Sequence, residues 1–475
     1  MEETKRKSKK RLFLYISLTS LLSLLSFLIL PIIIREILDY LLFPYNVNLL
    51  WVCVLIGIFF LLFDVMYHFG IHTKRITPIK AISHPFHHWQ SFSIGAVIIC
   101  WGFFFLGFSP SALWLREYNF WLIVFSFLIL GFIVIKLTFL RFLKVNLGNI
   151  SRVYLLVPFV IIALIGVASI PYLQIYAVIP STSSSEILEF NSNSTLIPLD
   201  VSYSWDVFLN DYSFSSFDSI QIQKNIQYND YSSLDVYYTS HTTQKNPLLI
   251  VIHGGGWFSG SKNDKPIQFV SRFFVAHGFT VFAINYRLFP SANIFEMVTD
   301  VRDAVVYAKS NAFHYNGNSN VTFLFGRSAG AHLGLLAAYS SNRTLVPEYP
   351  SIHTAPELEI QGVASMYGIT ELGTDSARLA GTDENQEFFP IQSVSPLNYV
   401  NNSNLTPTFL AAGSLDSLVS VKNSRLLHEA LNKYNITNLY LEIPWANHSF
   451  DNILQTPAGQ VTMYYLLNFF SHYSI

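Results

Sequence analysis

The strongest restriction on the fold of this chain is a glycine-flanked serine that follows an apolar run. Residues 326–330 read Gly-Arg-Ser-Ala-Gly and come directly after residues 321–325, which have the length and composition of a buried strand. Gly-x-Ser-x-Gly in that context predicts a sharp strand-to-helix turn that lifts the serine above a sheet edge. Residues 248–252 lead in the same way into 253–257, His-Gly-Gly-Gly-Trp. Because such a glycine loop exposes backbone N–H groups to a developing oxyanion, the two motifs together predict acyl transfer through Ser328.

A serine hydroxyl is a poor nucleophile at neutral pH, so it needs a histidine base and a carboxylate that orients the imidazole. The strand-like run 407–412 ends shortly before Asp416, and the run 439–444 ends shortly before His448. The carboxyl ends of strands in an open parallel sheet share one rim, where ligands bind. We therefore expect Asp416 and His448 to meet Ser328 at this rim.

Other residues compete for the acid role. Asp451 lies close to His448 in the sequence, and Asp383 and Glu384 precede Asp416. A helix cap or a turn is the alternative role for Asp416 itself. Among the histidines considered for the base, only His448 follows the last strand-like run.

From about residue 220 onward the chain resembles the α/β-hydrolase esterases. It is nearest the feruloyl-esterase-like branch, which also includes relatives of kynurenine formamidase and prenylcysteine methylesterase. The resemblance lies in 253–257 with 260–262, in 285–288 and 300–305, and in 326–333, Gly-Arg-Ser-Ala-Gly-Ala-His-Leu. In the hormone-sensitive-lipase branch nearby, the residue before the serine is usually aspartate.

The resemblance implies an α/β-hydrolase domain with a mostly parallel, doubly wound sheet. Helix-like segments at 295–311, 329–339, 420–434 and 459–470 alternate with the strand-like runs, as that fold requires. Carried over by position, the resemblance implies three catalytic residues and three backbone N–H groups of an oxyanion hole. The former are Ser328 as nucleophile, Asp416 as orienting acid and His448 as base, and the latter belong to Gly255, Gly256 and Ala329.

Four further residues near these motifs have two interpretations each. Trp257 and Tyr286 are candidates for the acyl or alcohol pocket, with a place in the aromatic core as the alternative. His253 is expected to brace the glycine loop, since a histidine in such a turn commonly bonds backbone. His332 is expected to pack inside the domain.

The first 180 residues have a different composition. Five apolar runs, at 12–34 and about 49–67, 91–108, 119–140 and 153–179, are almost free of charge. A helix of about 20 residues crosses a hydrocarbon core of ~30 Å. Of the whole chain, 51% is hydrophobic and only 12% charged, which argues against a wholly soluble protein. We therefore expect an all-α membrane domain over 12–180, with about five transmembrane helices.

Lysine and arginine residues predict the orientation of these helices. They gather in the tail 1–11 and in the loops after the second and fourth runs, whereas the loops after the first and third offer only Arg35 and Arg116. Basic loops stay in the cytoplasm. The N-terminus is thus expected inside, and an odd number of spans would place the domain 216–475 outside, at a bacterial surface or in a eukaryotic lumen. Residues 181–215 read as a polar linker or lid.

The sequence gives no indication of nucleic-acid binding, of a disulfide in the C-terminal domain or of a metal site. The net charge of −1 gives no indication of nucleic-acid binding. Cys53 and Cys100 both fall in apolar runs, so the domain 216–475 has no thiol and no disulfide. The second cytoplasmic loop is rich in histidine at irregular spacing and lacks cysteine or glutamate, which favours interfacial histidines over a metal site. These are His68, His72, His84, His87 and His88.

The sequence thus predicts a membrane-anchored serine carboxylesterase for short acyl esters, with no cofactor and no metal. Its substrate is expected to be a small acyl ester or an acylated surface glycan or lipid. One alternative is a lipase or deacylase that acts on a membrane lipid. Another is a membrane transport or interaction protein with a non-catalytic hydrolase fold, against which the complete triad argues.

Overall fold

The structure, a computed structural model, describes residues 219–240, 244–340, 352–373, 390–401 and 405–474, and scattered residues from 162 to 207. By its internal contacts the chain divides into two compact units, and every described residue belongs to the second, which includes 161–475. The basic tail, the histidine-rich loop and the first four expected membrane spans lie outside the described residues, as does most of the fifth. In the described ranges no helix has both the length and the apolar character needed to cross a bilayer.

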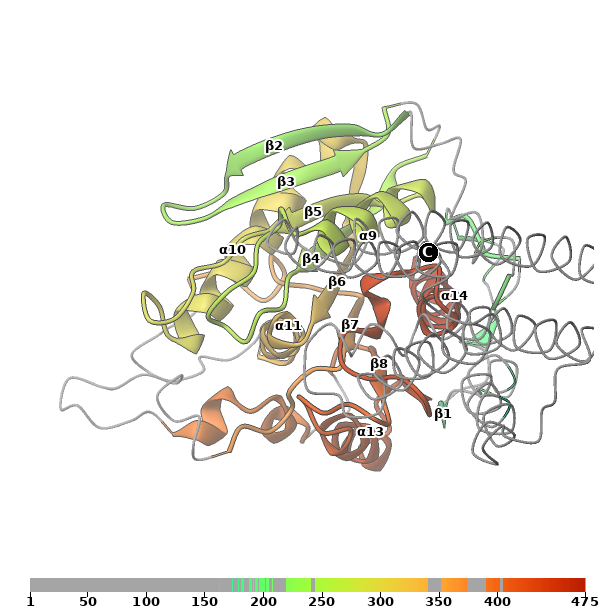
Figure 1. The fold of residues 1–475 in the computed structure, drawn as a ribbon. Coiled ribbons are helices and arrows are strands. Elements are labelled where there is room, and N and C mark those ends of the chain that lie inside the picture. Colours follow the sequence, from blue (N-terminus) through green and yellow to red (C-terminus); the bar gives the residue numbers. More distant parts are fainter. Residues whose placement is uncertain are drawn as a thin grey trace, which may run out of the picture. The chain divides into compact units, whose positions relative to one another are not determined.

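The described residues form a nine-stranded sheet in the order β1-β9-β8-β7-β6-β4-β5-β3-β2 (Figure 1). The six strands from β9 to β5 run parallel, whereas β1, β3 and β2 each pair antiparallel with their neighbour. The bounds are β1 Ser181–Thr182, β2 Gln221–Gln227, β3 Ser233–Tyr238, β4 Asn246–Ile252, β5 Thr280–Ile284, β6 Gly317–Arg327, β7 Gly362–Met366, β8 Thr408–Gly413 and β9 Asn438–Ile443.

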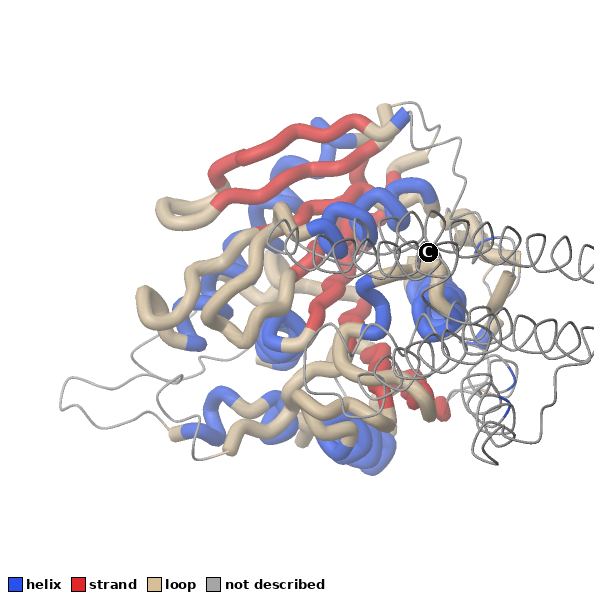
Figure 2. Tube along the Cα trace, in the orientation of Figure 1, coloured by secondary structure: helices blue, strands red, loops and turns tan. Residues whose placement is uncertain are grey.

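Helices cover both faces of this sheet, and the strands lie between them (Figure 2). Helices α10, α11 and α13 pack with one core, and α9 and α14 pack with the other. The bounds are α9 Lys265–Ala276, α10 Ile294–Asn311, α11 Ala329–Tyr339, α13 Lys422–Lys433 and α14 Pro457–His472. Short 3-10 helices are η6 Ala312–Tyr315, η8 Ile391–Val394, η9 Pro396–Tyr399 and η10 Phe450–Asn452.

The central strand β4 explains why the sequence shows continuous apolar runs. Leu248, Ile250 and Ile252 belong to one core, and Leu249 and Val251 belong to the other. A strand buried on both faces has no polar side to alternate with. The runs at 248–252, 321–325, 407–412 and 439–444 are indeed strands β4, β6, β8 and β9, and the expected mostly parallel, doubly wound sheet is confirmed.

Described residues of the segment expected as a linker contact the domain. Strand β1 forms one edge of the sheet and pairs with β9, with Ser181 opposite Tyr440. The backbone N–H of Ser204 donates to the Gln460 side chain at 2.7 Å, and Asn468 donates to the Leu188 carbonyl at 2.7 Å. These described residues therefore contact β9 and α14.

Candidate active site

Ser328 sits in a strained turn between β6 and α11. Its φ of 52° and ψ of −118° lie outside the regions that ordinary residues favour, as expected for a nucleophile elbow. The turn needs glycine at 330 because a Cβ atom there would lie 2.4 Å from the carbonyl oxygens of Ile252, the last residue of β4, and of His253, which follows it. The Ser328 N–H donates to the Met366 carbonyl at 2.9 Å, which ties the elbow to β7.

The structure brings Ser328, His448 and Asp416 together. Nε2 of His448 lies 3.0 Å from Oγ of Ser328, and Nδ1 of His448 lies 2.7 Å from Oδ2 of Asp416. An ionised carboxylate only accepts, so Nδ1 carries the proton and Nε2 is free to accept from the serine hydroxyl. The other Asp416 oxygen accepts the N–H groups of Leu418 and Val419 at 2.9 and 2.8 Å, which fixes the carboxylate.

The main alternative acid has another partner. Asp451 accepts from the Arg327 guanidinium at 2.7 Å and from the Tyr367 hydroxyl at 2.5 Å. The His448 imidazole bonds Asp416 instead. Asp383 and Glu384 lie outside the described residues.

Three backbone N–H groups near the elbow have no acceptor among the residues that the structure describes. They belong to Gly255, Gly256 and Ala329, the residues expected to form an oxyanion hole. Gly255 has a φ of 121°, a conformation that L side chains rarely adopt. Ala329 is the first residue of α11, where the helix dipole favours negative charge. Each of these N–H groups is therefore free to donate to a bound oxygen.

His253 and Tyr286 brace the glycine loop from behind. Their rings stack with centroids 4.3 Å apart, and the Tyr286 hydroxyl donates to the His253 carbonyl at 3.1 Å. Burial lowers the pKa of His253, so its imidazole is neutral and Nδ1–H donates to the Gly254 carbonyl at 2.7 Å. Tyr286 is thus part of the buried support, the second of its two interpretations.

Trp257 is also buried, and only 8% of its surface is exposed. Its ring meets His332 edge-on with centroids 5.3 Å apart, and its carbonyl accepts the Phe289 N–H at 2.9 Å. His332 is fully buried, as expected, and its Nε2 bonds the Val394 carbonyl at 2.7 Å. Burial lowers the pKa of His332 to about 4.

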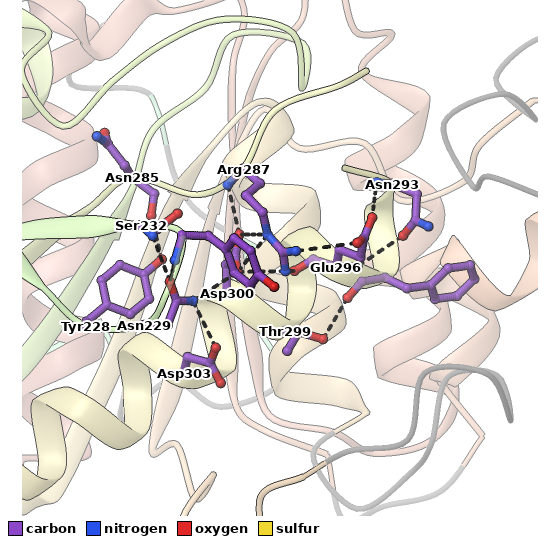
Figure 3. Close-up of polar contacts among 12 residues, drawn as sticks. Tyr228, Asn229, Ser232, Asn285, Arg287, Asn293, Glu296, Thr299, Asp300 and Asp303 are labelled. Carbon is purple, nitrogen blue, oxygen red and sulfur yellow. Dashed lines mark hydrogen bonds and ion pairs between the residues drawn. The ribbon is translucent and has the colours of Figure 1, made fainter. Parts of the chain in front are cut away.

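The loop after β5 is held by a polar cluster that the motifs alone did not reveal (Figure 3). Arg287 donates to Asp300 through its backbone N–H at 2.8 Å and through its guanidinium at 3.0 Å. The Asn285 carbonyl accepts the Tyr228 hydroxyl at 2.6 Å, while its side chain accepts the Lys262 N–H at 2.8 Å. This loop carries Tyr286, so the cluster supports the glycine loop indirectly.

Asn447 also belongs to the site, although the sequence motifs do not indicate it. Its side-chain oxygen accepts the N–H of Ser417 at 3.0 Å and the N–H of His448 at 2.7 Å. These bonds join the loop of the acid to the loop of the base. In the described ranges, no three histidine, cysteine, aspartate or glutamate side chains converge as metal ligands.

Parts of this chain are similar in sequence to known proteins. Residues 234–431 match the BD-FAE family model, a range that includes Ser328 and Asp416 and ends before His448. The relatives found include esterase LipQ of Mycobacterium tuberculosis, 30% identical over 221 residues, which are 44% of this chain and 51% of that protein. Isoprenylcysteine alpha-carbonyl methylesterase of Arabidopsis thaliana is 31% identical over 130 residues, 26% of this chain and 29% of that protein.

The chain spans about half the length of the bacterial relatives that it matches. Among solved structures, esterase B from Lactobacillus Rhamnosis is similar with a TM-score of 0.47 and 20% identity, over 54% of this chain and 87% of that one. The three bacterial relatives with this coverage are named as esterases or as a probable carboxylic ester hydrolase.

Proposed function

We propose that this chain is a serine esterase that hydrolyses carboxylic esters through an acyl-enzyme on Ser328. The observation that carries the proposal is the continuous path of hydrogen bonds from Asp416 through His448 to Ser328. The similarity of part of this chain to proteins named as esterases supports it. In this role Ser328 is the nucleophile, His448 the base and Asp416 the orienting acid.

In the first half-reaction, Oγ of Ser328 attacks the ester carbonyl carbon while Nε2 of His448 takes the hydroxyl proton. Asp416 stabilises the imidazolium that forms. The negative charge moves to the carbonyl oxygen, where the N–H groups of Gly255, Gly256 and Ala329 donate to it. When the carbonyl re-forms, the alcohol leaves with the proton from His448, and the acyl group stays on Ser328.

Water completes the second half-reaction by the same route. His448 takes a proton from water as its oxygen attacks the acyl carbon, and then returns the proton to Oγ of Ser328. The products are a carboxylic acid and the free serine. No step needs an oxidant, a reductant or a second substrate besides water.

Hydrolysis of a p-nitrophenyl ester series by the purified full chain in detergent tests this function. We expect turnover by the wild type and a loss of several orders of magnitude in Ser328→Ala. Ser240→Ala, which changes an exposed serine outside the triad, is the matched control. Absence of hydrolysis across the whole series by folded wild-type protein would contradict the proposal.

We further propose that the enzyme is anchored in a membrane and acts outside the cytoplasm, on small acyl esters or on acylated glycans or lipids. The support is the sequence alone, in the five apolar runs and the alternation of basic loops. Ser240→Cys, in a chain whose Cys53 and Cys100 are replaced, tests the orientation with an impermeant thiol reagent on intact cells. Labelling only after permeabilisation would contradict it and leave the esterase proposal unaffected.

A further inference from the structure

A buried polar cluster lies directly beside the catalytic histidine. Arg327 donates to Asp451 at 2.7 Å and to the Tyr367 hydroxyl at 2.9 Å, and the Tyr367 hydroxyl donates to the same Asp451 oxygen at 2.5 Å. Arg327 also donates to the side chain of Asn452. The Arg327 and Asp451 side chains are only 7% and 1% exposed. The cluster is therefore a buried ion pair whose two members both bond the Tyr367 hydroxyl.

Each member of the cluster belongs to a segment that carries or holds a triad residue. Arg327 is the residue before Ser328, and Asp451 follows His448 by three positions. Tyr367 follows Met366, whose carbonyl accepts the Ser328 N–H. The cluster thus joins the segments of the nucleophile and of the base across 124 residues of sequence.

Tyr367 also touches the base itself. Its ring meets the His448 imidazole edge-on, with centroids 4.5 Å apart. Tyr367 has a φ of 41°, an uncommon value for a bulky residue that persists only where surrounding contacts hold it. Burial raises the pKa of the Tyr367 hydroxyl well above its ordinary value, so this hydroxyl stays protonated and donates.

Stability alone does not explain a cluster of this kind. Buried ion pairs lose most of their attraction to the cost of removing both charges from water, and apolar residues often replace them without loss. The second Asp451 oxygen has no hydrogen-bond partner among the described residues, which adds to that cost. What the cluster supplies is a fixed geometry between two loops.

We propose that Arg327, Tyr367 and Asp451 are positioning residues that hold the His448 imidazole in reach of Ser328 Oγ. The inference rests on the proposed esterase function. Asn447 fixes the histidine loop relative to the acid loop, whereas this cluster fixes it relative to the nucleophile elbow. A displacement of about 1 Å between reacting groups can cost ~100-fold in rate.

Tyr367→Phe and a paired Arg327→Met, Asp451→Leu variant test the proposal in the full chain. The first keeps the ring against His448 and removes the hydroxyl, and the second removes both charges together. For each we would measure kcat and KM with p-nitrophenyl acetate, the rate constant of fluorophosphonate labelling, and the melting temperature. Rates are expressed per active site, counted by complete labelling.

We expect kcat and the labelling rate constant to fall about 10- to 100-fold in the paired variant, and less in Tyr367→Phe, with little change in KM. A merely stabilising cluster would lower the melting temperature and leave the rate per active site unchanged. The matched control is a paired Arg425→Met, Glu442→Leu variant, which removes a more exposed ion pair between α13 and β9. It should keep the wild-type rates.

The outcomes separate the two proposals. If the wild type is labelled at Ser328 and Tyr367→Phe and the paired variant react at the wild-type rate, the positioning role is wrong and the esterase function stands. If the wild type is neither labelled nor active, both are wrong. Should the paired variant fail to fold, Tyr367→Phe decides, because wild-type rates in that variant contradict the positioning role.

Discussion

Nε2 of His448 lies 3.0 Å from Oγ of Ser328, although 120 residues separate them in the sequence. Ser328 follows β6 and His448 follows β9, two strands that point the same way in the sheet. The loops after these strands meet on one rim, together with the loop after β8 that carries Asp416. The parallel sheet thus assembles the site.

Replacing the orienting acid should reduce turnover far more than replacing the neighbouring carboxylate. Asp416→Asn is expected to lower kcat about 10⁴-fold, as the equivalent change does in a serine protease, because the imidazole would then favour the wrong tautomer. Asp451→Asn should cost much less, since Asp451 bonds Arg327 and Tyr367 rather than His448. The reverse order of kcat values in the two variants would assign the acid role to Asp451.

Gly330→Ala should damage the elbow. The added Cβ would lie 2.4 Å from two carbonyl oxygens of the backbone, so α11 must move away from β4. We expect a loss of about 1 to 3 kcal/mol or more in the free energy of unfolding, measured by urea denaturation. Gly373→Ala is the control, because a Cβ there meets no atom within 4 Å. Equal stability of the two variants would contradict this account of the turn.

Asn447 should matter for rate through its oxygen. Asn447→Leu removes the acceptor for the N–H groups of Ser417 and His448, so we expect kcat to fall about 10- to 100-fold. Asn447→Asp keeps an oxygen in the same place and should lose less. If both variants turn over as the wild type does, the link between the two loops is not needed for catalysis.

The domain should lose stability in mild acid, in part because of His332. Burial lowers the pKa of His332 to about 4, whereas an exposed histidine titrates near ~6.5. Between these values the unfolded chain binds more protons than the folded one, so stability is lost as the pH falls from about 6.5 to about 4. His332 alone should contribute about 2 kcal/mol to the loss between pH 7 and pH 5.

Urea denaturation of the wild type and of His332→Gln at both pH values checks this contribution. His277, whose pKa burial also lowers to about 4, is present in both proteins and contributes equally to each. The pH dependence should therefore be weaker in the variant by the share of His332. An identical pH dependence in the two proteins would show that His332 is not buried in its neutral form.

The sequence was most informative where local pattern and fold coincide. Strand β4 is buried on both faces and contains the apolar run 248–252. Helix α11 begins and ends at the residues that the sequence predicts, 329 and 339. Tyr286 and Trp257 stayed ambiguous because an aromatic residue beside a glycine loop suits a pocket and a core equally well. Both residues belong to the same buried core as residues of α10, α11 and β5, which no local pattern reveals.

Contacts between distant loops could not be predicted for the same reason. Arg327 precedes the nucleophile and Asp451 is a competing candidate for the catalytic acid, but nothing in either segment indicates that the two residues pair. The pair forms only because the fold brings β6 and the loop after β9 together. The five-residue strand β5, Thr-Val-Phe-Ala-Ile, also lacks a distinctive sequence pattern. A short apolar run of this kind does not distinguish a strand from part of a buried helix.

The acyl-enzyme itself is the most direct test of the mechanism. The purified full chain would be mixed with p-nitrophenyl butyrate, quenched in acid within milliseconds and digested for mass spectrometry. We predict a butyryl group on the peptide that contains Ser328, at the same Oγ that accepts a fluorophosphonate, and no adduct in Ser328→Ala. An acyl group on a different residue, or undiminished hydrolysis by Ser328→Ala, would contradict the account.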